Sequence, residues 1–288
     1  MKVGSHTIEP SNEDKVFFPE SRITKGDLVH YYRDIAPIML PHVQDRPVTM
    51  HRFPDGIEGE GFYQKEVPEY FPQWVDRVRI SKKEGGENQQ AVCNNAATLV
   101  YLADQACITP HIWLSRTDRL NHPDKLVFDL DPPPDAFELV RKAAYGLKDV
   151  LKEIGLTPFV MTTGSRGVHV VAPLDRSQEF DTVRTFAENL ADSLFQEDPQ
   201  NLTTEQRKAK RGSRVFLDIM RNSYAQTSVA PYAVRAKPGA PVATPLEWRE
   251  LEDVTSQSYT ITTVLERMSQ KSDPWKSLYS EARPLPQL

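Results

Sequence analysis

The sequence predicts an α/β protein in which helices flank a mixed or antiparallel central sheet. Apolar runs of strand length alternate along the chain with amphipathic stripes of helical spacing. Two expected strands, 158–163 and 168–172, are joined by a very short link, which suits antiparallel neighbours and excludes a purely parallel doubly wound sheet. No repeat, low-complexity tract or long linker interrupts this pattern. We therefore expect a single domain over residues 1–288.

The composition is that of an ordinary soluble protein. Of the 288 residues, 39% are hydrophobic and 26% are charged. The net charge of −5 excludes a surface that is basic all over, although a local basic groove can still bind nucleic acid. The two cysteines provide neither a disulfide framework nor a thiolate zinc site. Because no apolar run reaches membrane-span length and the N-terminus lacks a signal pattern, we expect a cytoplasmic protein without a membrane partner.

The N-terminal half predicts two helices and several strands. Thr24 and Asp27 form a capping-box pattern at the start of the first helix, which Pro41 is expected to end. The second helix begins after Asn94 or Asn95. The strands expected in this half cover residues 48–52, 62–65 and 110–115, and the charged run 81–87 predicts an exposed hairpin tip.

The C-terminal half predicts the remaining elements. Its strands cover residues 125–131, 158–163, 168–172 and 214–219. Its helical stripes cover residues 137–151, 180–194 and 254–268. The proline-rich run 237–245 predicts an ordered strap across the surface. Residues 1–23 and 276–288 lack a periodic pattern, so we expect an irregular N-terminal segment and a C-terminal tail.

The most informative strand is Lys125–Asp131, which a run of prolines ends. Because side chains alternate along a strand, Asp129 and Asp131 point the same way while the apolar residues between them face the core. Two adjacent carboxylates repel unless a cation lies between them, and oxygen ligands favour magnesium or manganese over zinc. Asp218, in a separate apolar strand, is a candidate third ligand. The acids predict a metal-dependent phosphoryl-transfer site, and a solvated strand end is the alternative.

The short link between strands 158–163 and 168–172 is a candidate anion site. It contains two glycines, whose backbone amides lie beside the Ser165 hydroxyl and the Arg166 guanidinium, and His169 follows. A glycine turn chosen only for its conformation is the alternative interpretation. Two later arginines, Arg221 and Arg235, have the forked geometry that suits phosphate.

Three motifs together resemble one protein family. They are Phe128–Pro132, Gly164–His169 and Val215–Asn222, and the strap that ends at Trp248 follows them. In this order they resemble the polymerase domain of the non-homologous end-joining ligase of bacteria and archaea, the ligase D polymerase domain. That domain belongs to the archaeo-eukaryotic primase superfamily. The resemblance begins near Asn12 and implies a primase-like α/β catalytic core.

The resemblance also implies roles for the candidate residues. Asp129, Asp131 and Asp218 would be catalytic and would hold two divalent cations, Mn²⁺ or Mg²⁺. The NTP or dNTP would contact Arg52, His111, Thr163, Ser165, Arg166, His169, Arg221 and Arg235, with His111 near the ribose. DNA would contact Asn12, Lys15, Lys25, Phe62, Tyr63, Lys65, Lys82, Lys83 and Arg211. Of these, Asn12, Lys15 and Lys25 match a pocket that holds a 5′-phosphate. Phe62 or Tyr63 matches a position that stacks at the template.

Simpler interpretations exist for several of these residues, and two depart from the family pattern. Strand 62–65 can be interpreted as a core strand with one exposed lysine, and His111 as a structural histidine. The basic run before Asp218 can be interpreted as a solvated loop. The family usually has serine where Thr163 stands and lysine where Arg166 stands. Thr163 keeps the hydroxyl of serine and Arg166 keeps the positive charge of lysine. We therefore expect retained activity with an altered nucleotide affinity.

These features predict a template-directed nucleotidyltransferase that fills short gaps at broken DNA ends and prefers ribonucleotides. Its expected partners are DNA ends with a 5′-phosphate and a 3′ overhang or gap, the Ku end-binding protein and a DNA ligase, with a DNA-mediated dimer at synapsis and a location at the nucleoid. A primase that starts chains without a primer is one alternative. A non-catalytic module that bridges DNA ends is another, although a pure binder has no need of three acids that repel phosphate.

Overall fold

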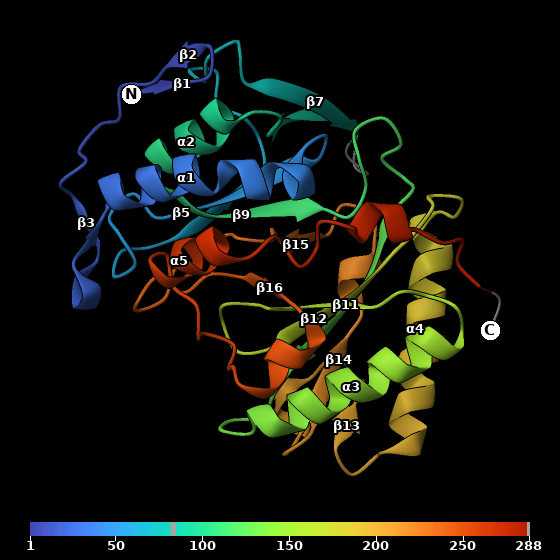
Figure 1. Cartoon of the computed structure of the whole chain (residues 1–288). Helices are drawn as coiled ribbons and strands as arrows, with labels where there is room; N and C mark the ends of the chain where they lie inside the picture. The colour runs from blue at the N-terminus through green and yellow to red at the C-terminus, as the bar shows by residue number, and fades with distance from the viewer. Residues whose placement is uncertain (82–84, 287–288) are drawn as a thin grey trace. The chain divides into compact units, whose positions relative to one another are not determined.

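The computed structural model describes residues 1–81 and 85–286 and confirms the expected α/β class (Figure 1). Backbone contacts divide the chain into two compact units, each with its own sheet. Unit 1 comprises residues 1–113, 227–243 and 259–271, and unit 2 comprises residues 114–226, 244–258 and the chain from 272 onward. Neither unit is a continuous stretch of sequence. The expected single domain over the whole chain stays a prediction.

The sheet of unit 1 has the strand order β15-β9-β5-β8-β7, with β6 paired to β5 outside this path. All of these pairings are antiparallel. The strands are β5 (Pro47–Arg52), β6 (Phe62–Gln64), β7 (Asp76–Ser81), β8 (Glu87–Val92), β9 (Cys107–Trp113) and β15 (Thr227–Val229). Helices α1 (Lys25–Val43) and α2 (Ala96–Asp104) pack against each other, as Figure 1 shows.

Helix α1 confirms the predicted start and extends past the predicted end. The Thr24 side chain accepts from the Asp27 amide and the Asp27 side chain accepts from the Thr24 amide, which completes the capping box. The predicted end at Pro41 is wrong, because the helix continues to Val43. Pro41 removes only its own bond to the preceding turn. The helix is held to the core by one face whose members, such as Ile35, are fully buried.

The sheet of unit 2 has the order β13-β14-β10-β12-β11-β16 and is mixed. The β13–β14 pair is parallel, and the other pairs are antiparallel. The strands are β10 (Lys125–Asp131), β11 (Phe159–Thr162), β12 (Val168–Pro173), β13 (Leu202–Thr203), β14 (Val215–Asp218) and β16 (Thr244–Leu246). Helices α3 (Phe137–Glu153) and α4 (Phe180–Glu197) both pack against this sheet. Strand β10, which carries two of the candidate acids, therefore lies inside the sheet with a neighbour on each side.

The N-terminal segment 1–23 is more regular than expected. It contains a two-stranded hairpin, β1 (Lys2–Val3) with β2 (His6–Thr7), and strand β3 (Val16–Phe18), which pairs with β4 (Ile23–Thr24). Phe17 and Phe18 have no exposed surface. Two adjacent buried phenylalanines anchor a segment whose polar composition hides its packing.

The last predicted helix is much shorter than its apolar stripe suggested. The stripe covered residues 254–268, whereas α5 spans Thr263–Gln270. The amide of Thr255 donates to the Ser258 hydroxyl at 2.8 Å, and the amide of Thr260 donates to the Thr263 hydroxyl at 2.8 Å. Hydroxyl side chains that accept from nearby amides offer the backbone an alternative to the helix, so the run of serines and threonines delays its start.

The C-terminal segment is packed rather than a free tail as far as the structure describes it. It contains the short 3₁₀-helix η5 (Leu278–Glu281), in which Leu278 is fully buried. Arg283 forms a parallel bridge with Leu174 beyond the end of β12. Among the described residues, no helix has the length and apolar character that crossing a membrane requires.

Candidate active site

The three candidate acids lie on one face of the unit 2 sheet. In the antiparallel register of β10 and β14, Asp129 is directly opposite Asp218. In the register of β10 and β12, Asp129 is directly opposite His169. Asp131 is two residues further along β10, so its side chain points to the same face. The register thus sets a row of His169, Asp129 and Asp218 across three strands, with Asp131 beside it.

Asp129 is buried and has two basic neighbours. Only 9% of its surface is exposed. His169 Nε2 lies 3.4 Å from Asp129 Oδ1, and Arg221 Nη2 lies 3.4 Å from Asp129 Oδ2. Burial raises the pKa of this carboxyl, but His169 and Arg221 outweigh it and bring the pKa to about 2. Asp129 is therefore held as a carboxylate.

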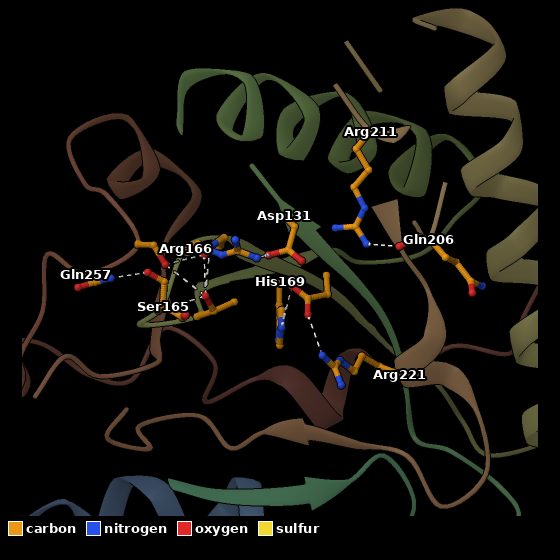
Figure 2. Close-up of polar contacts among 12 residues, drawn as sticks. Asp131, Ser165, Arg166, His169, Gln206, Arg211, Arg221 and Gln257 are labelled. Carbon is orange, nitrogen blue, oxygen red and sulfur yellow. Dashed lines mark hydrogen bonds and ion pairs between the residues drawn. The ribbon is translucent and has the colours of Figure 1, made fainter. Parts of the chain in front are cut away.

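Asp131 is in a different electrostatic state. Burial and the neighbouring charge of Asp129 raise its pKa, while Arg166 and Arg211 oppose the rise. Arg166 Nη2 lies 3.3 Å from Asp131 Oδ1, and Figure 2 shows this pair at the rim of the site. Two acids of one strand are thus each matched with an arginine, because like charges so close together need compensation.

The donor set fits a hard divalent cation. Asp129, Asp131 and Asp218 supply carboxylate oxygens from one face, and Asp218 Oδ1 already accepts from the Met220 amide at 2.8 Å, which orients it. Among the described residues, no three histidine, cysteine or acidic side chains are already gathered as a ligand shell. In the structure, Asp131 and Asp129 instead lie beside Arg166 and Arg221.

The predicted anion turn between β11 and β12 is shaped by two glycines. Gly164 has a φ of +63°, which favours glycine. A Cβ on Gly167 would lie 2.0 Å from the Leu130 carbonyl oxygen, so only glycine allows the turn to approach β10 between Asp129 and Asp131. The Gln257 side chain donates to the Ser165 carbonyl at 2.5 Å and braces the turn from outside (Figure 2). Ser165 and Arg166 are left at the rim.

Thr163 has a different place from the one expected. We expected its hydroxyl to contact a triphosphate, but the residue is only 5% exposed. The hydroxyl donates to the Gly167 carbonyl at 3.1 Å and lies 3.2 Å from the Ser256 hydroxyl. The amides of Ser165 and Gly167 each point to it at 3.3 Å. Thr163 therefore braces the turn from within.

Asn222, which the sequence reasoning missed, secures the strand that carries Asp218. It is fully buried in the short 3₁₀-helix η3 (Met220–Asn222). Its side chain accepts from the Val127 amide at 2.8 Å and donates to the Val127 and Ile219 carbonyls at 2.7 and 2.8 Å. It thereby replaces the ladder bonds that β10 loses where β14 ends. A side-chain amide four residues after Asp218, the last residue of β14, was the available signal.

Arg211 is tied to its own loop in unit 2. Its guanidinium donates to the Glu205 and Gln206 carbonyls at 3.0 and 2.9 Å, and the Gln206 contact is drawn in Figure 2. The same guanidinium lies 3.6 Å from the centre of the Phe216 ring. Its charge acts on Asp131, so this residue lies near the acids and is more than a solvated loop cation.

In unit 1, His111 belongs to a cluster of rings. Tyr63 stacks on His51 with centroids 4.1 Å apart and ring planes 7° apart. His111 meets Tyr63 edge-on at 5.5 Å and His51 at 6.3 Å. His51 was not among the predicted residues, although His51 lies opposite Tyr63 in the β5–β6 register. A histidine and a tyrosine on two of the predicted strands were the available sequence signal.

His51 predicts a pH dependence of stability. Burial and the charge of Arg235 lower its pKa to about 4 from the usual 6.5, and the Tyr63 and His111 rings enclose it further. Between pH 6.5 and 4 the unfolded chain therefore binds a proton that the folded chain refuses, so this contribution to stability falls as the pH falls through that window. We expect His51→Phe, which keeps a ring, to flatten the fall in urea midpoint between pH 7 and pH 5. An unchanged slope would contradict this assignment.

Arg52 and Phe62 lie on the other face of the β5–β6 pair from His51 and Tyr63. The two strands pair Arg52 with Phe62 and His51 with Tyr63, and successive residues of a strand point to opposite faces. We expected Arg52 to add charge at a triphosphate. Instead its guanidinium donates to the Gln105 carbonyl at 2.7 Å and to the Gln64 side chain at 2.7 Å. Phe62 and Tyr63 thus present separate faces for stacking.

The expected 5′-phosphate residues occupy contrasting environments. Asn12 and Lys15 are exposed, and Lys15 Nζ lies 2.7 Å from Asp55 Oδ1. Lys25 is only 5% exposed and uses its three donors on the Ser11 carbonyl, the Ser11 hydroxyl and Asp104 Oδ1, at 2.7, 2.9 and 2.6 Å. In this geometry Lys25 does not face a ligand. It clamps the N-terminal segment onto α1 and α2.

The Lys25–Asp104 pair predicts a large effect on stability. Asp104→Asn leaves a buried ammonium without its charge partner, and we expect a loss of about 3–5 kcal/mol in the free energy of unfolding by urea. The exposed pair supplies the control, because Lys15→Met breaks an ion pair in water and should cost less than about 1 kcal/mol. If the two variants lost the same free energy of unfolding, burial of the Lys25–Asp104 pair would not make it more important for stability than the exposed pair.

The other predicted residues are less tightly placed. Lys65 is exposed just after β6, and Arg235 is half-buried in unit 1, where its charge acts on His51. Lys82 and Lys83, expected at an exposed hairpin tip, lie outside the described residues.

Known proteins match most of this chain. A family model described as "LigD, primase-polymerase domain" matches residues 24–275. The "Multifunctional non-homologous end joining DNA repair protein LigD" of Mycobacterium tuberculosis H37Rv is 31% identical over 281 residues, which cover 94% of this chain and 37% of that protein. The "Bifunctional non-homologous end joining protein LigD" of Bacillus subtilis 168 is 30% identical, over 92% of this chain and 43% of that protein. The chain thus spans less than half of the length of these curated relatives.

One solved structure matches almost the whole chain. It is described as the polymerase domain from Mycobacterium tuberculosis ligase D in complex with DNA. The match has a TM-score of 0.89 and 29% sequence identity, and it covers 96% of this chain and 99% of that chain. The fold is therefore that of the archaeo-eukaryotic primase-like core, as the motifs implied.

Proposed function

The chain belongs to the LigD primase-polymerase domain family, and we propose that it is a template-directed nucleotidyltransferase that fills short gaps at DNA breaks during non-homologous end joining, with a preference for ribonucleotides. The observation that supports this most is the row of Asp129 and Asp218 in register, with Asp131 beside them and an anion turn against the same strand. Nucleotide transfer needs these two features together: acids for divalent cations and donors for a triphosphate.

We propose that the three acids hold Mn²⁺ or Mg²⁺. The chemistry that two such ions supply, when bound, is activation of the primer 3′-hydroxyl and stabilisation of the departing pyrophosphate. The low pKa of Asp129 keeps one carboxylate ionised for this purpose. Arg166 and Arg221 lie beside Asp131 and Asp129 and offset the repulsion between these two acids of one strand.

The same arginines are proposed to bind the nucleotide. The forked guanidinium groups of Arg166 and Arg221, which lie beside the acids, would bind phosphate oxygens, for which their geometry is suited. Ser165 at the rim of the turn, and His169 beside Asp129, are proposed as further phosphate donors. Thr163 acts behind them by holding the turn.

In unit 1 the ring cluster is proposed to serve the nucleoside. His111 is proposed to face the ribose, because its ring lies edge-on to that of Tyr63, which is exposed. Tyr63 is 60% exposed and lies on His51, so its outer face is available for a base. Arg235, whose charge reaches His51, is proposed to add positive potential there. Preference for ribonucleotides follows only if His111 contacts the 2′-hydroxyl.

DNA is proposed as the partner because the matched structure is a polymerase domain in complex with DNA. Lys15, Asn12 and the segment that Lys25 clamps are proposed to receive the 5′-phosphate at the far side of a gap. Arg211 and Lys65 are proposed to contact the DNA backbone. The relatives are named as end-joining LigD proteins, so Ku, a ligase activity and a DNA-mediated pair of such domains are proposed partners in the cell.

Lys15 predicts selectivity for phosphorylated ends. We expect Lys15→Ala to weaken binding of 5′-phosphorylated gapped DNA by roughly tenfold. Binding of the same DNA with a 5′-hydroxyl should weaken much less, because only the phosphorylated end offers a dianion to the lysine. Fluorescence anisotropy at a fixed salt concentration measures both. If the two substrates lose affinity equally, Lys15 contributes only general electrostatic attraction.

The central experiment is primer extension by the full chain on gapped, 5′-phosphorylated DNA with Mn²⁺ and with each NTP and dNTP. Templated addition that stops when the gap is filled supports the proposal. Dinucleotide synthesis on an unprimed template would indicate a primase instead. Bridging of two DNA ends without any incorporation would indicate a non-catalytic bridging module.

A further inference from the structure

The anion turn, residues 163–167 between β11 and β12, is held by two side chains from a distant part of the sequence. The Ser256 hydroxyl donates to the Gly167 carbonyl at 2.9 Å, and the Gln257 side chain donates to the Ser165 carbonyl at 2.5 Å. The donors follow their acceptors by 89 and 92 positions in the chain. Both contacts go to backbone carbonyls, so they hold the path of the turn itself.

A small turn of four residues presents these two side chains. The Thr255 amide donates to the Ser258 hydroxyl at 2.8 Å, which closes the chain over the two residues between them. Ser256 is only 4% exposed, whereas Gln257 is exposed. The anion turn is therefore supported once from the core and once from the surface.

The segment that carries this small turn is anchored to helix α3. Arg141 of α3 donates to the Leu251 carbonyl at 2.7 Å and to the Val254 carbonyl at 3.1 Å. Four residues along the helix, the Tyr145 hydroxyl donates to the Trp248 carbonyl at 2.8 Å. These bonds fix the segment to a helix of unit 2 before it reaches the anion turn. The two supporting side chains therefore start from backbone that is itself held in place.

The contact from Gln257 sets the direction of one backbone amide. In a trans peptide, the carbonyl and the amide hydrogen of the next residue point in opposite directions. Because the Ser165 carbonyl points to Gln257, the Arg166 amide points away from it. The amides of Ser165 and Gly167 are bonded to the Thr163 hydroxyl. The Arg166 amide makes no hydrogen bond to a described residue, so it is a donor available to an anion.

A polyphosphate is the ligand class that suits these donors. The Arg166 guanidinium lies 3.3 Å from Asp131 Oδ1, and Figure 2 shows this contact on the opposite side of the turn from the Gln257 contact. A bare anion is repelled by three carboxylates, whereas a polyphosphate that carries divalent cations is attracted to the acids as well as to the turn. Arg166 then offers it two kinds of donor, one from the backbone and one from the side chain.

We propose that Gln257 and Ser256 are positioning residues for nucleotide binding. By holding the Ser165 and Gly167 carbonyls, they keep the Arg166 amide directed at the triphosphate, and they do so without touching the nucleotide. If either support is lost, the turn can adopt other conformations, and the ligand must order it again at a cost in conformational entropy. This inference deepens the proposed function and rests on it, because it takes the triphosphate of an NTP or dNTP as the ligand of the turn.

The test removes the exposed support. Gln257→Met keeps an unbranched side chain but has no donor for the Ser165 carbonyl. Isothermal titration calorimetry of the full chain would measure its affinity for ATP and for inorganic triphosphate, both with Mn²⁺. We expect both Kd values to rise by roughly threefold to tenfold, the range for one lost hydrogen bond, with DNA affinity and the thermal midpoint unchanged. In primer extension, KM for the NTP should rise by the same factor while kcat stays the same, because ground state and transition state lose the same contact.

Two further variants accompany this measurement. Ser256→Ala removes the buried support and should weaken binding of both ligands at least as much. Here the thermal midpoint should fall as well, because the Gly167 carbonyl loses a donor in the core. Gln270→Met is the matched control, since Gln270 is an exposed glutamine at the end of α5. The control should bind both ligands like the wild type.

The outcomes separate this inference from the proposed function. Wild-type affinity of Gln257→Met for both ligands would overturn the inference. A loss for ATP alone would overturn it too, since the turn is proposed to hold phosphate rather than base. A wild type that binds neither ligand would overturn the inference together with the anion role of the turn. A wild type that binds inorganic triphosphate but never extends primers would overturn only the proposed function, because the comparison is read from binding.

Discussion

Asp129→Asn is expected to reduce nucleotide incorporation by roughly 10³-fold while the chain stays folded. Asparagine keeps the shape of the side chain, but it removes the negative charge from the centre of the row that His169 and Asp218 form with it. Several kcal/mol of transition-state stabilisation depend on charge at such sites, and each 1.36 kcal/mol is a factor of ten in rate. His169 and Arg221 lower the pKa of Asp129 to about 2, so the substitution removes a side chain that is charged at neutral pH.

The measurement is single-turnover primer extension with saturating DNA and Mn²⁺, alongside DNA affinity and thermal unfolding. Asp149→Asn is the matched control, because Asp149 is an exposed acid on α3 and its loss changes the net charge by the same amount. The control should extend primers like the wild type. Extension by Asp129→Asn at the wild-type rate would remove the acids from the catalytic role proposed for them.

Gly167→Ala is expected to damage both stability and activity. The added Cβ would lie 2.0 Å from the Leu130 carbonyl oxygen and 3.0 Å from the Leu130 carbonyl carbon. Both atoms belong to backbone inside the sheet, so no side-chain rotation relieves the overlap and β10 must shift. We expect a loss of about 1–3 kcal/mol in stability, as for other overpacked sites. Activity should fall further than stability, because Leu130 separates Asp129 from Asp131.

Gly146 provides the matched control for this substitution. It lies on α3, has nothing within 4 Å of an added Cβ and does not adopt a positive φ. Gly146→Ala should therefore stabilise the protein by about 0.5–1 kcal/mol, because alanine favours the helix. Urea unfolding and primer extension of the two variants would be compared. A Gly167→Ala protein as stable and active as the wild type would show that the close approach to β10 is unimportant.

Local patterns in the sequence predicted much of the fold correctly. The capping box at Thr24 and Asp27 depends on atoms three residues apart, and it forms as expected. Strand Lys125–Asp131 has the predicted bounds, because its apolar residues and the prolines that follow are local signals. The final helix failed for a reason that is also local: serine and threonine hydroxyls compete for its first amides.

The candidate site was predictable only in part. Alternation along one strand placed Asp129 and Asp131 on a common face, and motif resemblance nominated Asp218. The same reasoning treated Lys25 and Lys15 alike, although Lys25 is buried against Asp104 and Lys15 is exposed. The partner of Lys25 is 79 residues away in sequence. It also overlooked His51 and Asn222, which act through neighbours on other strands.

The sequence by itself determined where many of the longer strands and helices of this protein lie and which residues carry acid, base and aromatic chemistry, because those properties depend on a few neighbouring residues. Only the tertiary structure decided which of these residues meet. The register of β10 with β14 sets Asp129 opposite Asp218, and the register of β5 with β6 sends Phe62 and Tyr63 to opposite faces. Strand register follows from the packing of the whole sheet, since a slip of one residue would turn every side chain to the other face.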